Sequence, residues 1–196
     1  QDKWFRPVTP TGLTEEKWVK AIEIRPMTPA TRGVVHHSLA FLLQQEDGPA
    51  GLPEDVDVPF GPNLFMEWAV GKAGQIFRPD TGKLMLPGSQ IMWEMHMHAN
   101  GERVPNAQVE LAVWFHDEPP AHRTILSMLD ARGPNSLDIP PNEIAVTQGT
   151  FVLAAPARLE NFQPHMHMRG KAMSMEAIYP NGSREVLAFV DNYQWN

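Results

Sequence analysis

Short apolar blocks, several of them alternating with polar residues, run along most of this chain, and Pro, Gly, Asn and Asp separate the blocks. This pattern predicts strands rather than long helices. We expect strands over 21–27, 33–45, 86–98 and 107–117, and shorter strands within 124–130, 142–156, 157–180 and 184–196. The segment 13–22 is the exception, because it predicts a short helix with Thr14 as N-cap and acidic residues in the first turn.

Turn residues predict how some of these strands connect. Asn100 and Gly101 lie between the strands 86–98 and 107–117, which we therefore expect to pair as a hairpin. The sequence PNGS over 180–183 predicts a second hairpin turn.

The stretch 117–123 breaks the strand pattern and is the expected domain boundary. Short strands at this spacing are typical of β-sandwiches. The sequence thus predicts an all-β fold of two consecutive antiparallel, jelly-roll-like β-sandwich domains, over 1–119 and 120–196.

Composition excludes several classes of function. The formal net charge is −7, and basic residues do not cluster, so we expect no nucleic-acid partner. No apolar stretch is long enough to predict a transmembrane segment. Cysteine is absent, which excludes disulfides and thiolate metal sites.

The chain has 8 histidines, and most of them lie in three close groups: His36 with His37, His96 with His98, and His165 with His167. Side chains two residues apart in a strand point to the same face, so the third group can bind one ion. Met166 and Met168 would then face the other way and pack in the core.

Adjacent histidines need a different explanation. Neighbours on a regular strand point to opposite faces, so His36 and His37 could be one core and one surface histidine. Both can bind one ion only where the strand ends or bulges, or where they use different ring nitrogens. Because two other histidine groups accompany them, we favour the metal site.

The residue types narrow the choice of metal. Imidazoles with nearby methionines and no cysteine favour copper or zinc over magnesium or calcium, which prefer oxygen ligands. A zinc hydrolase with a glutamate base stays open, although the HExxH motif is absent.

Three motifs in this order resemble one known family. They are VVHHSLAF (34–41), LPGSQIMWEMHMHANG (86–101) and PHMHMRGKAMSMEAIYPNG (164–182). Together they are similar to the copper type II, ascorbate-dependent monooxygenases, the family of peptidylglycine α-hydroxylating and dopamine β-monooxygenases, and above all to bacterial relatives. The resemblance runs from about residue 13 to the end of the chain.

The resemblance implies two β-sandwich domains with one copper each. An electron-transferring copper would be bound by His36, His37 and His96, with His98 outside the ligand set. The copper that reacts with O2 and substrate would be bound by the catalytic histidines His165 and His167. The family's third ligand to that copper is a methionine on a later strand, beyond this chain, and its first strands precede Gln1. Both domains are therefore expected to be incomplete.

The implied activity is hydroxylation of a C–H bond in a small-molecule or peptide substrate, with O2 as oxidant and ascorbate or another one-electron donor as reductant. We expect a periplasmic or secreted location. The alternative is a copper-binding or electron-transfer protein of the same fold that does not hydroxylate, as a module of a larger extracellular assembly. A third interpretation is a β-sandwich interaction domain whose histidines bind zinc or bind metal adventitiously.

Overall fold

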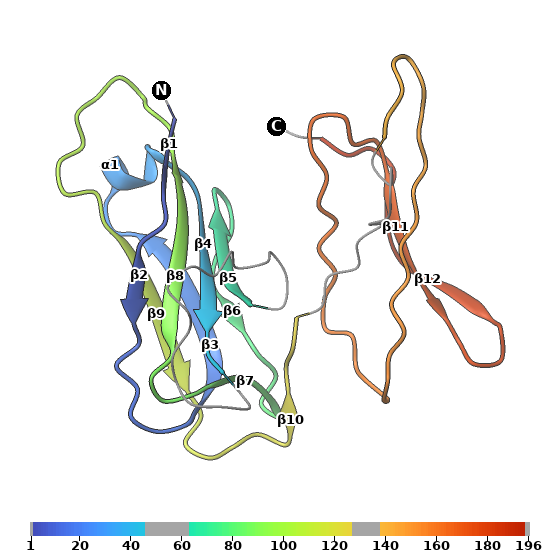
Figure 1. Cartoon of the computed structure of the whole chain (residues 1–196), viewed down its shortest axis with the longest axis horizontal. Coiled ribbons are helices and arrows are strands. Elements are labelled where there is room, and N and C mark those ends of the chain that lie inside the picture. The colour runs from blue at the N-terminus through green and yellow to red at the C-terminus, as the bar shows by residue number, and fades with distance from the viewer. Residues whose placement is uncertain (1, 46–62, 127–137, 195–196) are drawn as a thin grey trace. The chain divides into compact units, whose positions relative to one another are not determined.

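The computed structural model describes residues 2–45, 63–126 and 138–194 (Figure 1). The regular elements among these residues are strands, apart from a single short helix, so the prediction of an all-β fold is confirmed. The chain divides into two compact units, 1–130 and 131–196, and each is described by itself. The expected boundary after residue 119 lies inside the first unit, because β10 (His122–Arg123) pairs with β7 (Thr81–Met85).

One sheet of the first unit carries the candidate site. Its strands are β1 (Lys3–Phe5), β2 (Val8–Pro10), β4 (Val35–Leu43), β5 (Leu64–Ala69) and β8 (Gln90–Met97). They pair antiparallel in the order β1-β8-β4-β5, and β2 also pairs with β8. The helix α1 (Pro29–Arg32) leads into β4, and the hydroxyl of Thr28 caps it by accepting a hydrogen bond from the Thr31 N–H.

The second sheet of this unit is built around β3 (Lys17–Pro26). The order is β10-β7-β3-β6, where β6 is Gln75–Ile76, and β9 (Val109–Phe115) pairs with β3 as well. Only the short β10 runs parallel to its neighbour.

The two sheets share one hydrophobic core. It contains Val19, Ile22 and Ile24 of β3 together with residues of β4, β5, β7 and β8, and the apolar side chains of β9 pack against it. Fully burying one such aliphatic side chain stabilises the fold by about 1.5–3 kcal/mol. This shared core holds the site-bearing sheet by its inner face and leaves its outer face for other contacts.

The prediction of a helix over 13–22 is wrong, because residues from Lys17 onward belong to β3. A register shift between Val19 and Ala21 marks a β-bulge in the pairing of β3 with β9. The bulge puts Val19 and Ile22 in the same core although they are three residues apart. That spacing also occurs on one face of a helix, which explains the false prediction.

The expected hairpin between 86–98 and 107–117 is also wrong. Both strands form, as β8 and β9, but β8 pairs with β4 on one edge and with β1 and β2 on the other. Since both edges of β8 are occupied, β9 pairs with β3 in the other sheet. Gly101 has a positive φ, as a turn requires, but the connection passes between sheets.

The second unit contains one antiparallel hairpin, formed by β11 (Met173–Ile178) and β12 (Arg184–Val190). Its turn confirms the prediction over 180–183, since the Tyr179 N–H donates to the Ser183 carbonyl and Gly182 has a positive φ. The described residues 138–172 form no strand, so the strand expected within 142–156 is wrong, whereas the range 157–180 forms a strand only in its last part, as β11. Most of the strand expected within 124–130 lies outside the described residues.

Candidate metal centre

A row of side chains crosses the outer face of the first sheet. In the register of the strands, His96 of β8 lies directly opposite His37 of β4 on one side and opposite Trp4 of β1 on the other. Directly opposed residues of antiparallel strands project to the same face. Trp93, three residues before His96 in β8 and buried in the core, faces the opposite way. The three ring systems are therefore neighbours on the outer face.

His36 joins this row through a β-bulge. Val35 is opposite Met97 and His37 is opposite His96, so β4 has one more residue than β8 at this point. The extra residue is His36. A bulge of this kind breaks the strict alternation of faces, which is the condition under which adjacent histidines can reach one ion.

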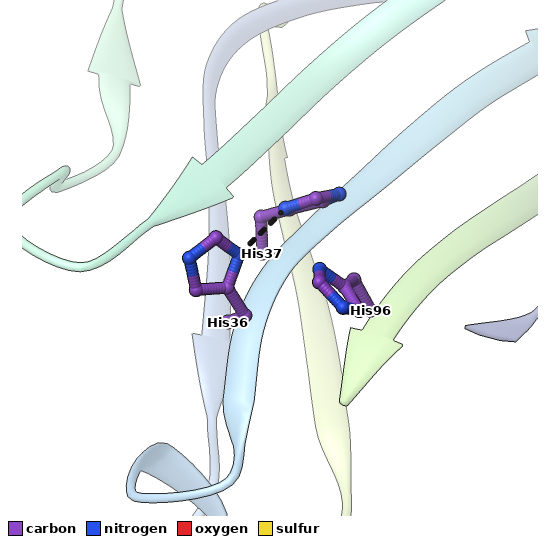
Figure 2. A group of neighbouring side chains, drawn as sticks. All are labelled: His36, His37 and His96. Carbon is purple, nitrogen blue, oxygen red and sulfur yellow. Dashed lines mark hydrogen bonds between the residues drawn. The ribbon is translucent and has the colours of Figure 1, made fainter. Parts of the chain in front are cut away.

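The three imidazoles converge (Figure 2). The Nδ1 atoms of His36 and His37 lie 3.1 Å apart. One donor nitrogen from each of His36, His37 and His96 lies within 4.8 Å of the others. Nitrogen ligands bound at about 2.0 Å in tetrahedral geometry lie about 3.3 Å from each other. The spacing thus suits a shared metal ion.

One ring nitrogen of His96, Nδ1, makes no hydrogen bond in the described part of the chain. Its side chain is 13% exposed, and its Nε2 lies 2.8 Å from Oδ2 of Asp2. Its Nδ1 is buried and has no hydrogen-bond partner among the described residues. A buried nitrogen without a partner is costly, and a metal ion would satisfy it. The residues present therefore fit a metal held by three imidazoles.

His37 is adapted to ligation because it is half-buried. Burial lowers the pKa of His37, and the neighbouring His96 and His36 lower it further. A lowered pKa favours the neutral imidazole, which is the form that binds metals.

His98 lies outside the cluster, as expected from the resemblance. It follows the last residue of β8, its side chain is exposed, and its Nδ1 lies 2.7 Å from Oδ1 of Asp2. Hydrogen bonds with His96 and then with His98 lower the pKa of Asp2. Asp2 is thus an ionised carboxylate shared by two histidines.

The histidines His165 and His167 also meet, within the second unit. Their Nε2 atoms lie 3.1 Å apart, and the two rings are nearly perpendicular, at 89°. Both side chains are exposed. The segment that carries them is not a strand, so their proximity comes from the local loop conformation rather than from alternation along a strand.

Local contacts shape this loop. The Gly170 N–H donates to the His167 carbonyl, and the Tyr193 hydroxyl donates to the Met166 carbonyl at 2.6 Å. Met166 is half-buried, in line with the expected packing role. Met168 is 78% exposed, so the expectation that it packs in a core is wrong for the described structure.

The sequence did not predict that three residues lie near these histidine groups: Asp2, Trp4 and Tyr193. Asp2 and Trp4 reach His96 only because β1 pairs with β8, which no short-range signal indicates. Trp4 is about half-exposed and lies on the outer face. A single tyrosine beyond a hairpin likewise carries no signal that points to Met166.

In the described part of the chain, the group of His36, His37 and His96 is the one place where the donor atoms of three or more His, Cys, Asp or Glu side chains converge. No helix among the described residues has the length and apolar character to cross a bilayer. Comparisons of this chain with protein-family models, with curated proteins and with solved structures found no match.

Proposed function

We propose that this chain is a copper-dependent monooxygenase that hydroxylates a C–H bond of a small-molecule or peptide substrate. The observation that carries the proposal is the convergence of His36, His37 and His96, with a buried His96 Nδ1 left for a metal. The resemblance of the three histidine motifs to copper type II monooxygenases supports the choice of reaction.

The ligand set favours copper. All three donors are imidazoles, which bind both Cu(I) and Cu(II), and the chain has no cysteine that would supply a thiolate. In this proposal His36, His37 and His96 hold an electron-transferring copper, and His165 and His167 hold the copper at the reaction site. When bound, the two ions supply one-electron transfer and O2 activation, with ascorbate or another one-electron donor as the reductant.

The protein residues have defined tasks in this scheme. The bulge at His36 and the register of His37 with His96 would let one sheet supply all three nitrogens to the metal. A shallow depression lined by Trp4, Arg6 and Glu94 opens beside His96 and gives a small reductant an approach. Such chemistry suits a periplasmic or secreted protein.

A second candidate function is copper binding with electron transfer but without hydroxylation. It is favoured by one observation: within the described residues, three His, Cys, Asp or Glu side chains converge at His36, His37 and His96 and at no second place. A two-nitrogen site with exposed side chains binds copper more weakly than a three-nitrogen site. A chain that loads one copper would serve as a carrier or as a module of an extracellular assembly.

Metal content with copper EPR separates these functions. The proposal predicts two copper ions per chain after loading, reduction by ascorbate, and O2 consumption that rises with a substrate from a panel of C–H compounds. His165→Ala should abolish O2 consumption and retain one copper, while His122→Ala, in the exposed β10, should change neither.

The other outcomes have different meanings. One copper in the unaltered chain, with ascorbate reduction and no O2 consumption, would support the electron-transfer function. Loss of both coppers in His165→Ala would contradict two separate sites. Zinc or no metal in place of copper would contradict both functions.

A further inference from the structure

The pairing of β1 with β8 places the carboxylate of Asp2 next to His96, one of the three candidate ligands. The two strands run side by side in Figure 1, and their register sets Trp4 opposite His96. Asp2 lies just before β1, and its Oδ2 is 2.8 Å from Nε2 of His96 while its Oδ1 is 2.7 Å from Nδ1 of His98. An ionised carboxylate only accepts hydrogen bonds, so both histidine nitrogens donate to it.

This contact fixes the tautomer of His96. A neutral imidazole has one N–H and one lone pair, and the hydrogen bond to Asp2 keeps the hydrogen on Nε2. The lone pair is then on Nδ1, the nitrogen that is buried without a partner. The carboxylate also makes the imidazole a stronger donor toward a metal, because it stabilises positive charge on the ring.

Two more contacts hold this arrangement. The ring of Trp4 stacks on the ring of His96, with centroids 4.2 Å apart and planes within 3°. The stacking restricts rotation of the His96 ring about its own axis. His98 binds the second oxygen of Asp2, which gives an otherwise exposed carboxylate two anchor points.

We propose that Asp2 is the positioning residue of the three-histidine centre, and that it orients His96 and strengthens it as a metal ligand while His98 anchors Asp2. The inference rests on the proposed metal-binding function of His36, His37 and His96. It adds a carboxylate–histidine pair between Asp2, just before β1, and His96 of β8, and it makes His98 a support of Asp2 rather than a metal ligand.

The test compares Asp2→Ala and Asp2→Asn in the full chain. Asp2→Ala removes the acceptor and should weaken Cu(II) binding by about 10–100-fold in a chelator competition, the usual effect of losing such a partner. Asp2→Asn keeps a neutral acceptor and should lose less affinity. Both variants should raise the Cu(II)/Cu(I) reduction potential, because a weaker imidazole donor stabilises Cu(II) less. Glu110→Gln, which removes an exposed carboxylate of β9, is the matched control.

A second measurement does not depend on copper. Ring ¹⁵N chemical shifts of His96 in the metal-free protein report which nitrogen carries the hydrogen. We expect the Nε2–H form in the unaltered chain and in Glu110→Gln, and a mixture in Asp2→Ala. Circular dichroism checks that the variants are folded. If Asp2→Ala does not fold, the comparison is made with Asp2→Asn.

The outcomes separate this inference from the proposed function. Unchanged ring shifts, affinity and potential in both Asp2 variants would overturn the positioning role, even with copper bound at the three histidines. Absence of copper binding in the unaltered chain would overturn the proposed function, while the ring shifts would still decide whether Asp2 sets the His96 tautomer.

Discussion

His36 and His37 are consecutive residues of β4, yet their Nδ1 atoms lie 3.1 Å apart. On a regular strand these side chains would point to opposite faces. The β-bulge opposite β8 removes that constraint and turns both rings toward His96. Ligand geometry here is therefore a property of the strand pairing, not of two side chains alone.

Replacing His36 by alanine should remove one ligand without altering the fold, because His36 is exposed and contributes nothing to the core. We expect copper affinity at this centre to fall by more than about a hundredfold, beyond the usual effect of losing a partner outside the ligand set. Copper titration followed by EPR measures this loss. Undiminished copper affinity would show that His36 and His37 do not bind the same copper ion.

His96→Ala and His98→Ala should differ sharply. His96 offers its buried Nδ1 to the centre, whereas the ring of His98 donates to the Asp2 carboxylate outside the centre. Loss of His96 should abolish binding at the three-histidine centre, and loss of His98 should weaken it only several-fold. Parallel copper titrations of the two variants provide the comparison, and equal losses would contradict the assignment of His96 as ligand.

Lys83 should make stability depend on pH. Its Nζ donates to the Phe65 carbonyl at 2.8 Å and lies near the rings of Phe65 and Phe77. Burial, helped by Lys72, lowers the pKa of Lys83 from 10.5 to about 8. Below about pH 8 both the folded and unfolded chains carry the charge, and burying it costs on the order of 3 kcal/mol.

Between about pH 8 and 10.5 the folded chain has lost this proton while the unfolded chain keeps it. The contribution of Lys83 to the free energy of unfolding therefore increases with pH across this window. Urea denaturation of the unaltered chain and of Lys83→Met, at several pH values, should show their difference shifting in favour of the unaltered chain. Lys20→Met, in an exposed position of β3, is the control. A difference that stays constant with pH would contradict the lowered pKa.

Gly170→Ala should disturb the pair His165 and His167. A Cβ at Gly170 would lie 2.5 Å from the Met166 Cβ and 3.0 Å from its Sδ, so the loop between the histidines must move. Overpacking of this kind costs about 1–3 kcal/mol. We expect weaker copper binding at this pair and no change at the three-histidine centre, as measured by the separate EPR components. Ser174→Ala, on the exposed face of β11, should leave both signals unchanged.

The strands that carry the first site were predictable, because their apolar and branched residues are dense. β4 lies within the predicted 33–45 and β8 within 86–98. The grouping of His36 and His37 with His96 came from the family resemblance, since alternation alone left His96 and His98 equivalent. The structure separates them by register, with His96 opposite His37 and His98 beyond the end of β8.

Other features depend on long-range pairing and leave no local trace. The bulge in β3 gave Val19 and Ile22 a spacing that also fits a helix. β9 pairs with β3 because β8 has no free edge, which is decided by strands far away in the sequence. For the same reason, the neighbours Asp2 and Trp4 of His96 could not be predicted.

Asp2 stands next to a three-residue strand at the edge of its sheet, and such edges open and close without global unfolding. Detachment of β1 would take Asp2 and Trp4 away from His96, so fraying and metal affinity are thermodynamically linked. The coupling is reciprocal. If pairing of β1 with β8 raises the affinity for the metal by some factor, metal binding raises the equilibrium constant for that pairing by the same factor. Slower hydrogen exchange of the β1 amides on copper loading would record that linkage, and exchange at this short edge strand would then report whether the centre holds a metal.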